Sequence, residues 1–276
     1  MGASLRVALI GCGAIGTTLA KAIDAGKAGK VELALVFDTK SGACDVLVKK
    51  LHFKPKIVKR AKDIFVDKTV ELVIEAASQR AVVKYALSVL KSKKDLMVMS
   101  VGALGDERLL RAIRKAAERA GRRVYVPSGA ILGIDGIKAA GEGIEEVTLT
   151  TRKPPVALAY SDYVRRKGIN LTKLRKPIVV FRGTAREAVK AFPESVNVAA
   201  TLSLAGIGFS KTKVRIVADP SLNRNVHEIR VRGKAGEFIT EARNVPFPDN
   251  PRTSYLAALS AIRTLRNLTE NIKIGT

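Results

Sequence analysis

The stretch that decides the fold is RVALIGCGAIGTTLAKAIDAG, residues 6–26. An apolar strand runs into Gly11, Gly13 and Gly16, and a helical pattern begins within the same turn. In a dinucleotide-binding turn, the first glycine allows the tight bend, the second lets a pyrophosphate approach the backbone, and the third lets the helix pack on the strand. The phosphates then lie at the helix N-terminus, where free N–H groups favour negative charge. The order of strand, loop and helix therefore predicts a dinucleotide site.

An acidic residue follows at the expected distance. Asp38 ends the apolar run LALVFDTK (33–40), about 20 residues after the glycine loop. Its carboxylate is placed to accept hydrogen bonds from a ribose 2′-hydroxyl and repels a 2′-phosphate, which favours NAD. Lys40 partly offsets that repulsion, so the use of NADP stays open. We predict NAD as the cofactor, with NADP as the alternative, and further contacts from Ala14 and Ile15 at the helix start.

The first 127 residues alternate short apolar runs with amphipathic stretches. The apolar runs lie at residues 5–11, 31–38, 70–77, 95–102 and 122–129. The candidate helices lie at residues 14–26, 43–51, 79–92 and 106–120. Gly121 is placed to end the last of them. Continuous apolar strands between helices are typical of a parallel sheet covered on both faces, so this part is predicted to be a doubly wound (Rossmann) α/β domain spanning residues 1–127.

The pattern changes in the second half of the chain. Strand-like runs lie at residues 145–155, 176–183, 213–220 and 227–244, and helical runs at 186–192, 194–209 and 254–272. Polarity alternates along the last strand run, which folds back at GKAG (233–236) into a hairpin. We predict an α+β domain with a mostly antiparallel sheet over residues 128–251, for substrate binding, catalysis and dimerisation. A final helix, 252–270, is expected to complete the first domain.

Charge is the unusual feature of the composition. The chain has 276 residues with 49 Lys or Arg against 25 Asp or Glu, a formal net charge of +24. Such a field attracts phosphate groups and is typical both of nucleic-acid binders and of enzymes with anionic ligands. No helix-turn-helix, zinc-finger or aromatic RNA-binding signature accompanies the charge, which disfavours nucleic acid as a partner. Gln79 is the only glutamine, a depletion typical of thermophiles.

Composition also bounds the class of protein. The chain is 47% hydrophobic, enough for a sizeable core, but no apolar stretch reaches the roughly 18 residues that span a bilayer. No basic segment precedes the first apolar run, so a signal peptide is not expected. Cys12 and Cys44 are too few for a disulfide framework and do not have the spacing of metal ligands. We expect a cytoplasmic protein with no membrane segment and no metal site.

Small residues follow the fourth and fifth predicted strands. Ala77 and Ser78 end the fourth, and Val101 and Gly102 end the fifth. Because the carboxyl ends of the strands line the ligand crevice of an open α/β sheet, we expect these four residues to contact the cofactor. Cys12 lies inside the glycine loop, beneath the predicted pyrophosphate, and is interpreted as a small packing residue rather than a catalytic thiol.

Only two histidines are present to move a proton near neutral pH. His52 follows a basic helix in the first domain and is interpreted as a surface or capping residue. His227 begins a strand whose alternation places it on one face with Ile229 and Val231. On these residues alone, His227 is either a core histidine or the catalytic base.

Seven stretches together resemble one known family. They are VALIGCGAIG (7–16), VIEAAS (73–78), VMSVGAL (98–104), VPSGAILGIDGIKAA (126–140), FPESVNVAATLSLAGIG (192–208), ADPSLNRNVHEIRVRGKAGEF (218–238) and NPRTSYLAALSAI (250–262). With them the chain resembles the L-aspartate dehydrogenase family over nearly its whole length. The resemblance implies NAD(P)-dependent oxidative deamination of L-aspartate to iminoaspartate, which hydrolyses to oxaloacetate and ammonia or feeds NAD biosynthesis.

The resemblance also implies roles for particular residues. It assigns catalysis to His227 and contacts on the nicotinamide side to Ala130 and Asn197. It implies a homodimer, for which the apolar face of a one-sided sheet is a candidate surface. The stretch 151–182 matches no family motif, so the roles of its residues stay open.

Two other functions remain open. Another two-domain NAD(P) oxidoreductase, of the homoserine or the sugar and polyol dehydrogenase type, shares the layout, and a NAD-sensing nucleic-acid-binding protein would use the positive charge. An aspartate pocket needs cations or N–H donors for two carboxylates. Arg224, Lys211 and Lys213 are candidates for that role because they lie near His227 in the sequence.

Overall fold

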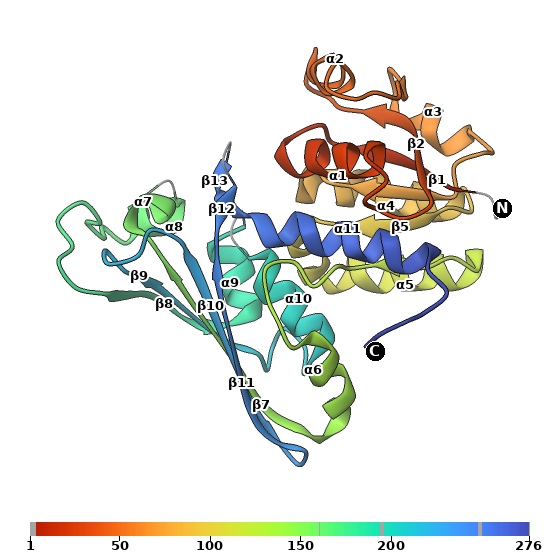
Figure 1. Cartoon of the computed structure of the whole chain (residues 1–276). Coiled ribbons are helices and arrows are strands. Elements are labelled where there is room, and N and C mark those ends of the chain that lie inside the picture. The colour runs from red at the N-terminus through yellow and green to blue at the C-terminus, as the bar shows by residue number, and fades with distance from the viewer. Residues whose placement is uncertain (1–3, 160, 194–195, 248–249, 276) are drawn as a thin grey trace. The chain divides into compact units, whose positions relative to one another are not determined.

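A computed structural model describes residues 4–159, 161–193, 196–247 and 250–275 (Figure 1). Internal contacts divide the chain into two units. Unit 1 comprises Met1–Pro127 and Ala258–Ile274, and unit 2 comprises Ser128–Ala257 and Gly275–Thr276. Across the described residues, every helix is too short or too polar to cross a membrane.

A six-stranded parallel sheet forms the centre of unit 1. Its strands are β1 (Leu5–Ile10), β2 (Val31–Phe37), β3 (Lys56–Ile57), β4 (Leu72–Glu75), β5 (Asp95–Val98) and β6 (Val124–Tyr125). They lie in the order β3-β2-β1-β4-β5-β6, and each neighbouring pair is parallel. The strand order reverses between β1 and β4, which is where such sheets bind ligands. The predicted doubly wound fold is confirmed.

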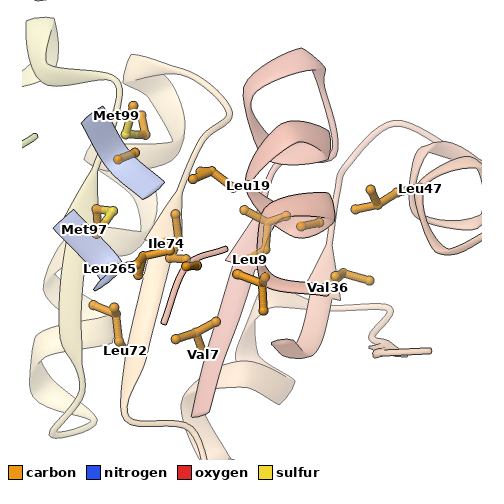
Figure 2. Close-up of a cluster of buried hydrophobic side chains, with 14 of the residues drawn as sticks. Val7, Leu9, Leu19, Val36, Leu47, Leu72, Ile74, Met97, Met99 and Leu265 are labelled. Carbon is orange, nitrogen blue, oxygen red and sulfur yellow. The ribbon is translucent and has the colours of Figure 1, made fainter. Parts of the chain in front are cut away.

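Helices cover both faces of this sheet. They are α1 (Ala14–Asp24), α2 (Ala43–Val48), α3 (Ala61–Val66), α4 (Gln79–Lys91), the 3₁₀ turn η1 (Val101–Gly105), α5 (Glu107–Ala120) and α11 (Tyr255–Thr269). On one face, Leu19 of α1 and Leu265 of α11 join Leu9 and Ile74 of the strands in one buried cluster (Figure 2). On the opposite face, α4 packs through residues such as Val82. Burial on both faces is the reason that these strands are apolar at consecutive positions.

The ends of α5 follow from its sequence. Asp106 accepts hydrogen bonds from the backbone N–H groups of Arg108 and Leu109, at 2.8 and 3.1 Å, and so caps the N-terminus. Gly121 ends the helix in the left-handed conformation, with φ +61°, as predicted. Elsewhere the expected bounds were too long, because the predicted helix 43–51 ends at Val48.

Unit 2 contains a five-stranded mixed sheet in the order β11-β10-β7-β9-β8. Its strands are β7 (Ile144–Lys153), β8 (Ile178–Thr184), β9 (Lys213–Ala218), β10 (Asn225–Gly233) and β11 (Gly236–Asn244), and a separate pair is formed by β12 (Pro246–Phe247) and β13 (Asn250–Ser254). Only β7 and β9 are parallel neighbours in the five-stranded sheet. Gly233 pairs with Gly236, so the predicted hairpin and the mostly antiparallel sheet are confirmed.

The helices of unit 2 differ in part from the expected ones. They are α6 (Ile134–Ala140), the 3₁₀ turn η2 (Gly141–Gly143), α7 (Pro155–Leu158), α8 (Asp162–Arg166), α9 (Ala185–Ala191) and α10 (Asn197–Ala205). The expected helix 194–209 ends at Ala205, before Gly206, and its residues 194–195 lie outside the described part of the chain. The two short helices α7 and α8 lie in the stretch that matched no motif. The final helix begins at Tyr255, because β13 takes up the residues before it.

The two faces of the unit 2 sheet differ in chemistry. Apolar side chains such as Val147, Leu149 and Ile229 are buried on the face that α6 and α10 cover. On the outer face, Lys213 and Arg232 form ion pairs with Glu146 at 2.7 and 3.5 Å, and the side chains of both cations are exposed. Alternation places these charges outward. The expectation of an apolar dimer surface on this sheet is therefore wrong.

Candidate functional site

The glycine loop between β1 and α1 has the geometry that close packing imposes. Gly11 has φ +105°, and a Cβ there would lie 2.6 Å from the carbonyl oxygen of Ala76. A Cβ on Gly16 would lie 2.0 Å from the carbonyl oxygen of Gly11, so α1 packs directly on the loop. A Cβ on Gly13 would meet no atom within 4 Å. The backbone at Gly13 therefore faces open space, as the approach of a pyrophosphate requires.

The N-terminus of α1 suits an anion. Gly13 is its N-cap, no side chain caps the helix, and the first turn, which begins with Ala14 and Ile15, contains no acidic residue. The first N–H groups of a helix have no partner within the helix and carry its positive dipole end. The loop and the helix start thus fit the phosphates of a dinucleotide.

Asp38 is held beside this loop. Its Oδ2 accepts a hydrogen bond from the backbone N–H of Cys12 at 2.7 Å, and its Oδ1 accepts one from the N–H of Lys40 at 2.8 Å. Gly11 N–H donates to the carbonyl of Phe37 at 2.8 Å, which brings the end of β2 against the loop. A carboxylate has about four acceptor positions, so Asp38 retains capacity for ribose hydroxyls.

A buried carboxylate joins the ends of β4 and β5. Glu75 accepts hydrogen bonds from the N–H groups of Ala77 and Ser78, both at 2.9 Å, and from the N–H and hydroxyl of Ser100 at 3.0 and 2.9 Å. Burial raises the pKa of Glu75 above its usual value. Ala77 and Ser78 are exposed beside the glycine loop.

The placement of Val101 and Gly102 differs from the prediction. Strand β5 ends at Val98, and these two residues lie buried in the turn η1. The strand stops because the N–H of Ser100 bonds to the side chain of Glu75 instead of continuing the ladder. Both residues still follow β5 at the carboxyl edge of the sheet.

The cysteines are not suited to chemistry as nucleophiles. The Sγ atoms of Cys12 and Cys44 lie 3.5 Å apart, and both side chains are thiols. Burial raises the pKa of Cys12 and of Cys44, which disfavours the reactive thiolate. The geometry supports the interpretation of Cys12 as a packing residue.

His227 lies in unit 2, on the helix-covered face of β10. It is 5% exposed, and its Nδ1 lies 3.0 Å from Oγ1 of Thr151, its cross-strand neighbour on β7. Burial, and then the positive charge of Lys153, lower the pKa of His227 to about 3. The imidazole is therefore neutral at physiological pH and offers one nitrogen to a proton. His52, by contrast, is exposed on unit 1.

Lys153 is the site residue that sequence reasoning missed. It is 6% exposed, and burial lowers its pKa to about 8. Burial is the only cause of this shift, and no acidic group among the described residues contributes to it. A signal was present in the sequence, because alternation along β7 places Lys153 on the same face as Leu149 and Thr151. Lysines are rarely buried without a partner, so a lysine on an apolar face is a candidate functional residue.

The remaining candidates are one buried residue, Ala130, and four exposed ones. The carbonyl of Ala130, which is buried, accepts a hydrogen bond from Nδ2 of Asn244 at 3.0 Å. Asn197 is exposed as the first residue of α10. Lys213 lies on the sheet face opposite to His227 and pairs with Glu146, so its assignment to the carboxylates is wrong. Lys211 and Arg224 are exposed.

Comparison with known proteins gives the family. The family model described as "Aspartate dehydrogenase, C-terminal" matches residues 135–268, and the model "Homoserine dehydrogenase, NAD binding domain" matches residues 11–127. An L-aspartate dehydrogenase of Methanosarcina mazei is 49% identical over 99% of this chain and 100% of its own length. The chain belongs to the L-aspartate dehydrogenase family. The predicted resemblance is thereby confirmed, and the chain is an enzyme with a pyridine-nucleotide-binding domain.

Solved structures agree with that assignment. The crystal structure of aspartate dehydrogenase from Thermotoga maritima has 31% identity and a TM-score of 0.77, and the match covers 98% of this chain and 99% of that one. A WlbA dehydrogenase from Chromobacterium violaceum, solved with NADH and UDP-GlcNAcA, matches over 100% of this chain and 89% of its own with a TM-score of 0.58. Its 13% identity shows a shared fold only. Within the aspartate dehydrogenase family, the matched C-terminal region includes both His227 and Lys153.

Proposed function

We propose that this enzyme oxidises L-aspartate with NAD, giving iminoaspartate, which hydrolyses to oxaloacetate and ammonia. The observation that carries the proposal is His227, a buried neutral imidazole held by Thr151 in the part of the chain that matches the aspartate dehydrogenase C-terminal model. We assign cofactor binding to residues 1–127 with the final helix, and substrate binding and catalysis to residues 128–251.

The cofactor assignment rests on the fit of unit 1. Gly11, Gly13 and Gly16 shape the loop, Asp38 lies beside it, and the start of α1 has free N–H groups for the phosphates. Bound NAD supplies the acceptor for the hydride that leaves Cα of the substrate. The carboxylate of Asp38 would repel a 2′-phosphate, so we propose NAD rather than NADP.

In this proposal His227 moves the proton that accompanies hydride loss. We assign Nδ1–H as the donor to Oγ1 of Thr151, 3.0 Å away, which leaves Nε2 as an acceptor. Nε2 then takes a proton either from the substrate ammonium group or from the water that adds to the imine carbon. The hydrogen on Cα leaves with the two electrons of its bond as hydride. The substrate nitrogen loses one proton, and the C=N bond forms between Cα and this nitrogen.

Finer assignments rest on composition and on the family resemblance. We propose a homodimer in the cytoplasm of a thermophile, with contacts from Ala77, Ser78, Val101 and Gly102 to the cofactor. Ala130 and Asn197 are proposed to lie on the nicotinamide side. The imine product is proposed to be available to pyridine nucleotide biosynthesis.

A substrate panel tests the proposal. We expect purified protein to reduce NAD with L-aspartate but not with L-malate or L-homoserine, and to have a higher kcat/KM with NAD than with NADP. The reduced nicotinamide is followed by its near-ultraviolet absorbance. Reduction with homoserine and none with aspartate would overturn the substrate. A higher kcat/KM with NADP would overturn the assigned cofactor preference alone.

A further inference from the structure

Lys153 is a buried cation without a counter-charge in unit 2. Its side chain is 6% exposed, so the ammonium group is not extended into solvent as those of most lysines are. The nearest acid along the backbone is Asp219, whose N–H donates to the carbonyl of Lys153 at 2.9 Å. The carboxylate of Asp219 instead accepts from the N–H and hydroxyl of Ser221, at 3.0 and 2.6 Å. A buried charge in this state is destabilising unless a ligand completes it.

Lys153 opens on a small, largely apolar pocket. Lys153 and Thr151 are its polar lining residues, Val196, Val198 and Ala199 come from the start of α10, and the other lining residues are Leu149, Leu158, Val214 and Ile216. The first turn of α10 contains no acidic residue, and its N-cap, Val196, has no side-chain oxygen with which to cap the helix. The positive end of the helix dipole and the ammonium group therefore act on the same pocket.

The pocket is also next to the proposed catalytic group. Thr151, which lines it, is the residue hydrogen-bonded to His227 at 3.0 Å, and Lys153 is two positions along the same face of β7. The charge of Lys153 is close enough to lower the pKa of His227. The pocket and His227 are therefore linked through Thr151.

We propose that Lys153, with the N-terminus of α10, binds a carboxylate of the dicarboxylate substrate beside His227. This inference rests on the proposed function for the identity of the substrate. A carboxylate bound to Lys153 offsets its positive charge, so the pKa of His227 rises and His227 becomes a stronger base once substrate is present. Lys153 thus couples substrate binding to the activation of the base.

Lys153→Met tests the inference, with Lys213→Met as the matched control, since Lys213 lies on the opposite sheet face in an exposed ion pair. We expect Lys153→Met to raise the KM for L-aspartate about 100-fold and to weaken succinate binding to the NADH-bound enzyme, measured by calorimetry, by a similar factor. NADH affinity stays unchanged. The melting temperature without ligand rises by about 2 °C or more, because a buried unpaired charge is removed.

The outcomes separate this inference from the proposed function. A Lys153→Met enzyme whose KM and succinate affinity stay within about twofold of the wild type overturns the role of Lys153 and leaves aspartate oxidation standing. A wild type that binds succinate through Lys153 but does not oxidise aspartate overturns the proposed function and supports the carboxylate site. Lys153→Gln, which keeps a polar end without the charge, gives the same comparison if the methionine variant does not fold.

Discussion

At the scale of single residues, the site of unit 2 is defined by what burial does to titratable groups. Burial lowers the pKa of His227 to about 3 and of Lys153 to about 8, so near neutral pH the imidazole is neutral and the lysine is largely a cation. Thr151 connects them, since it is the cross-strand partner of His227, is hydrogen-bonded to it, and lies two positions from Lys153 on the same face of β7. Perturbed pKa values that occur together with a pocket are typical of functional sites.

Thr151 is predicted to act as a positioning residue for His227. Thr151→Val removes the hydroxyl that fixes the imidazole tautomer and keeps the side-chain volume, so kcat for aspartate oxidation should fall about 10-fold or more. Thr151→Ser keeps the hydroxyl and should restore most of the rate, and NADH affinity should be the same in both variants. Equal kcat values for the valine and serine variants would exclude this role.

At the scale of elements, the β1–α1 junction combines two different glycine requirements. Gly16 is needed for packing, because its Cβ would overlap the carbonyl oxygen of Gly11 at 2.0 Å. Gly13 is not needed by the fold, because a Cβ there meets nothing within 4 Å. The space at Gly13 is therefore available to a ligand.

Two substitutions separate these requirements. Gly13→Ala should leave the melting temperature within about 2 °C of the wild type and weaken NADH binding at least about 10-fold, because the new methyl group occupies the phosphate approach. Gly16→Ala should lower the melting temperature by about 5 °C or more. Calorimetry and NADH fluorescence give both quantities. Gly136→Ala in α6, also in open space, is the control, and NADH binding as weak as that of Gly13→Ala would contradict a local effect.

Elements were the part of the structure that the sequence predicted best. Periodicity defined β1, α1 and the β10–β11 hairpin, because each buries one face or both faces continuously. It failed where side chains end an element, as at Ser100, whose N–H bonds to Glu75 and stops β5. It also missed α7 and α8, which have 4 and 5 residues and are too short for a helical period to show.

The candidate site was predictable only in part. The glycine loop and Asp38 follow one another along a short stretch, so spacing alone was informative. The candidates for binding the carboxylates were the cations near His227 in the sequence. Nearness in sequence does not decide the sheet face, and Lys213 lies on the face opposite to His227. Lys153 comes from β7, which pairs with β10 only after folding, and no local pattern shows that pairing.

At the scale of the whole molecule, the two proposed halves of the redox site lie in different units of the chain. Unit 1 provides the dinucleotide loop, and unit 2 provides His227 with its buried neighbours. The family relationship covers nearly the whole chain, which supports a single function for both units. The high positive charge fits an anionic substrate with two carboxylates and an anionic cofactor, because such a field raises the local concentration of both.

The most direct test of this account is aspartate oxidation by His227→Ala, measured together with NADH binding. We expect a kcat/KM at least about 100-fold below that of the wild type, with unchanged NADH affinity. Unchanged affinity would show that unit 1 is intact and that the loss belongs to His227. Full turnover of aspartate by His227→Ala, with NADH still bound, would contradict the central claim.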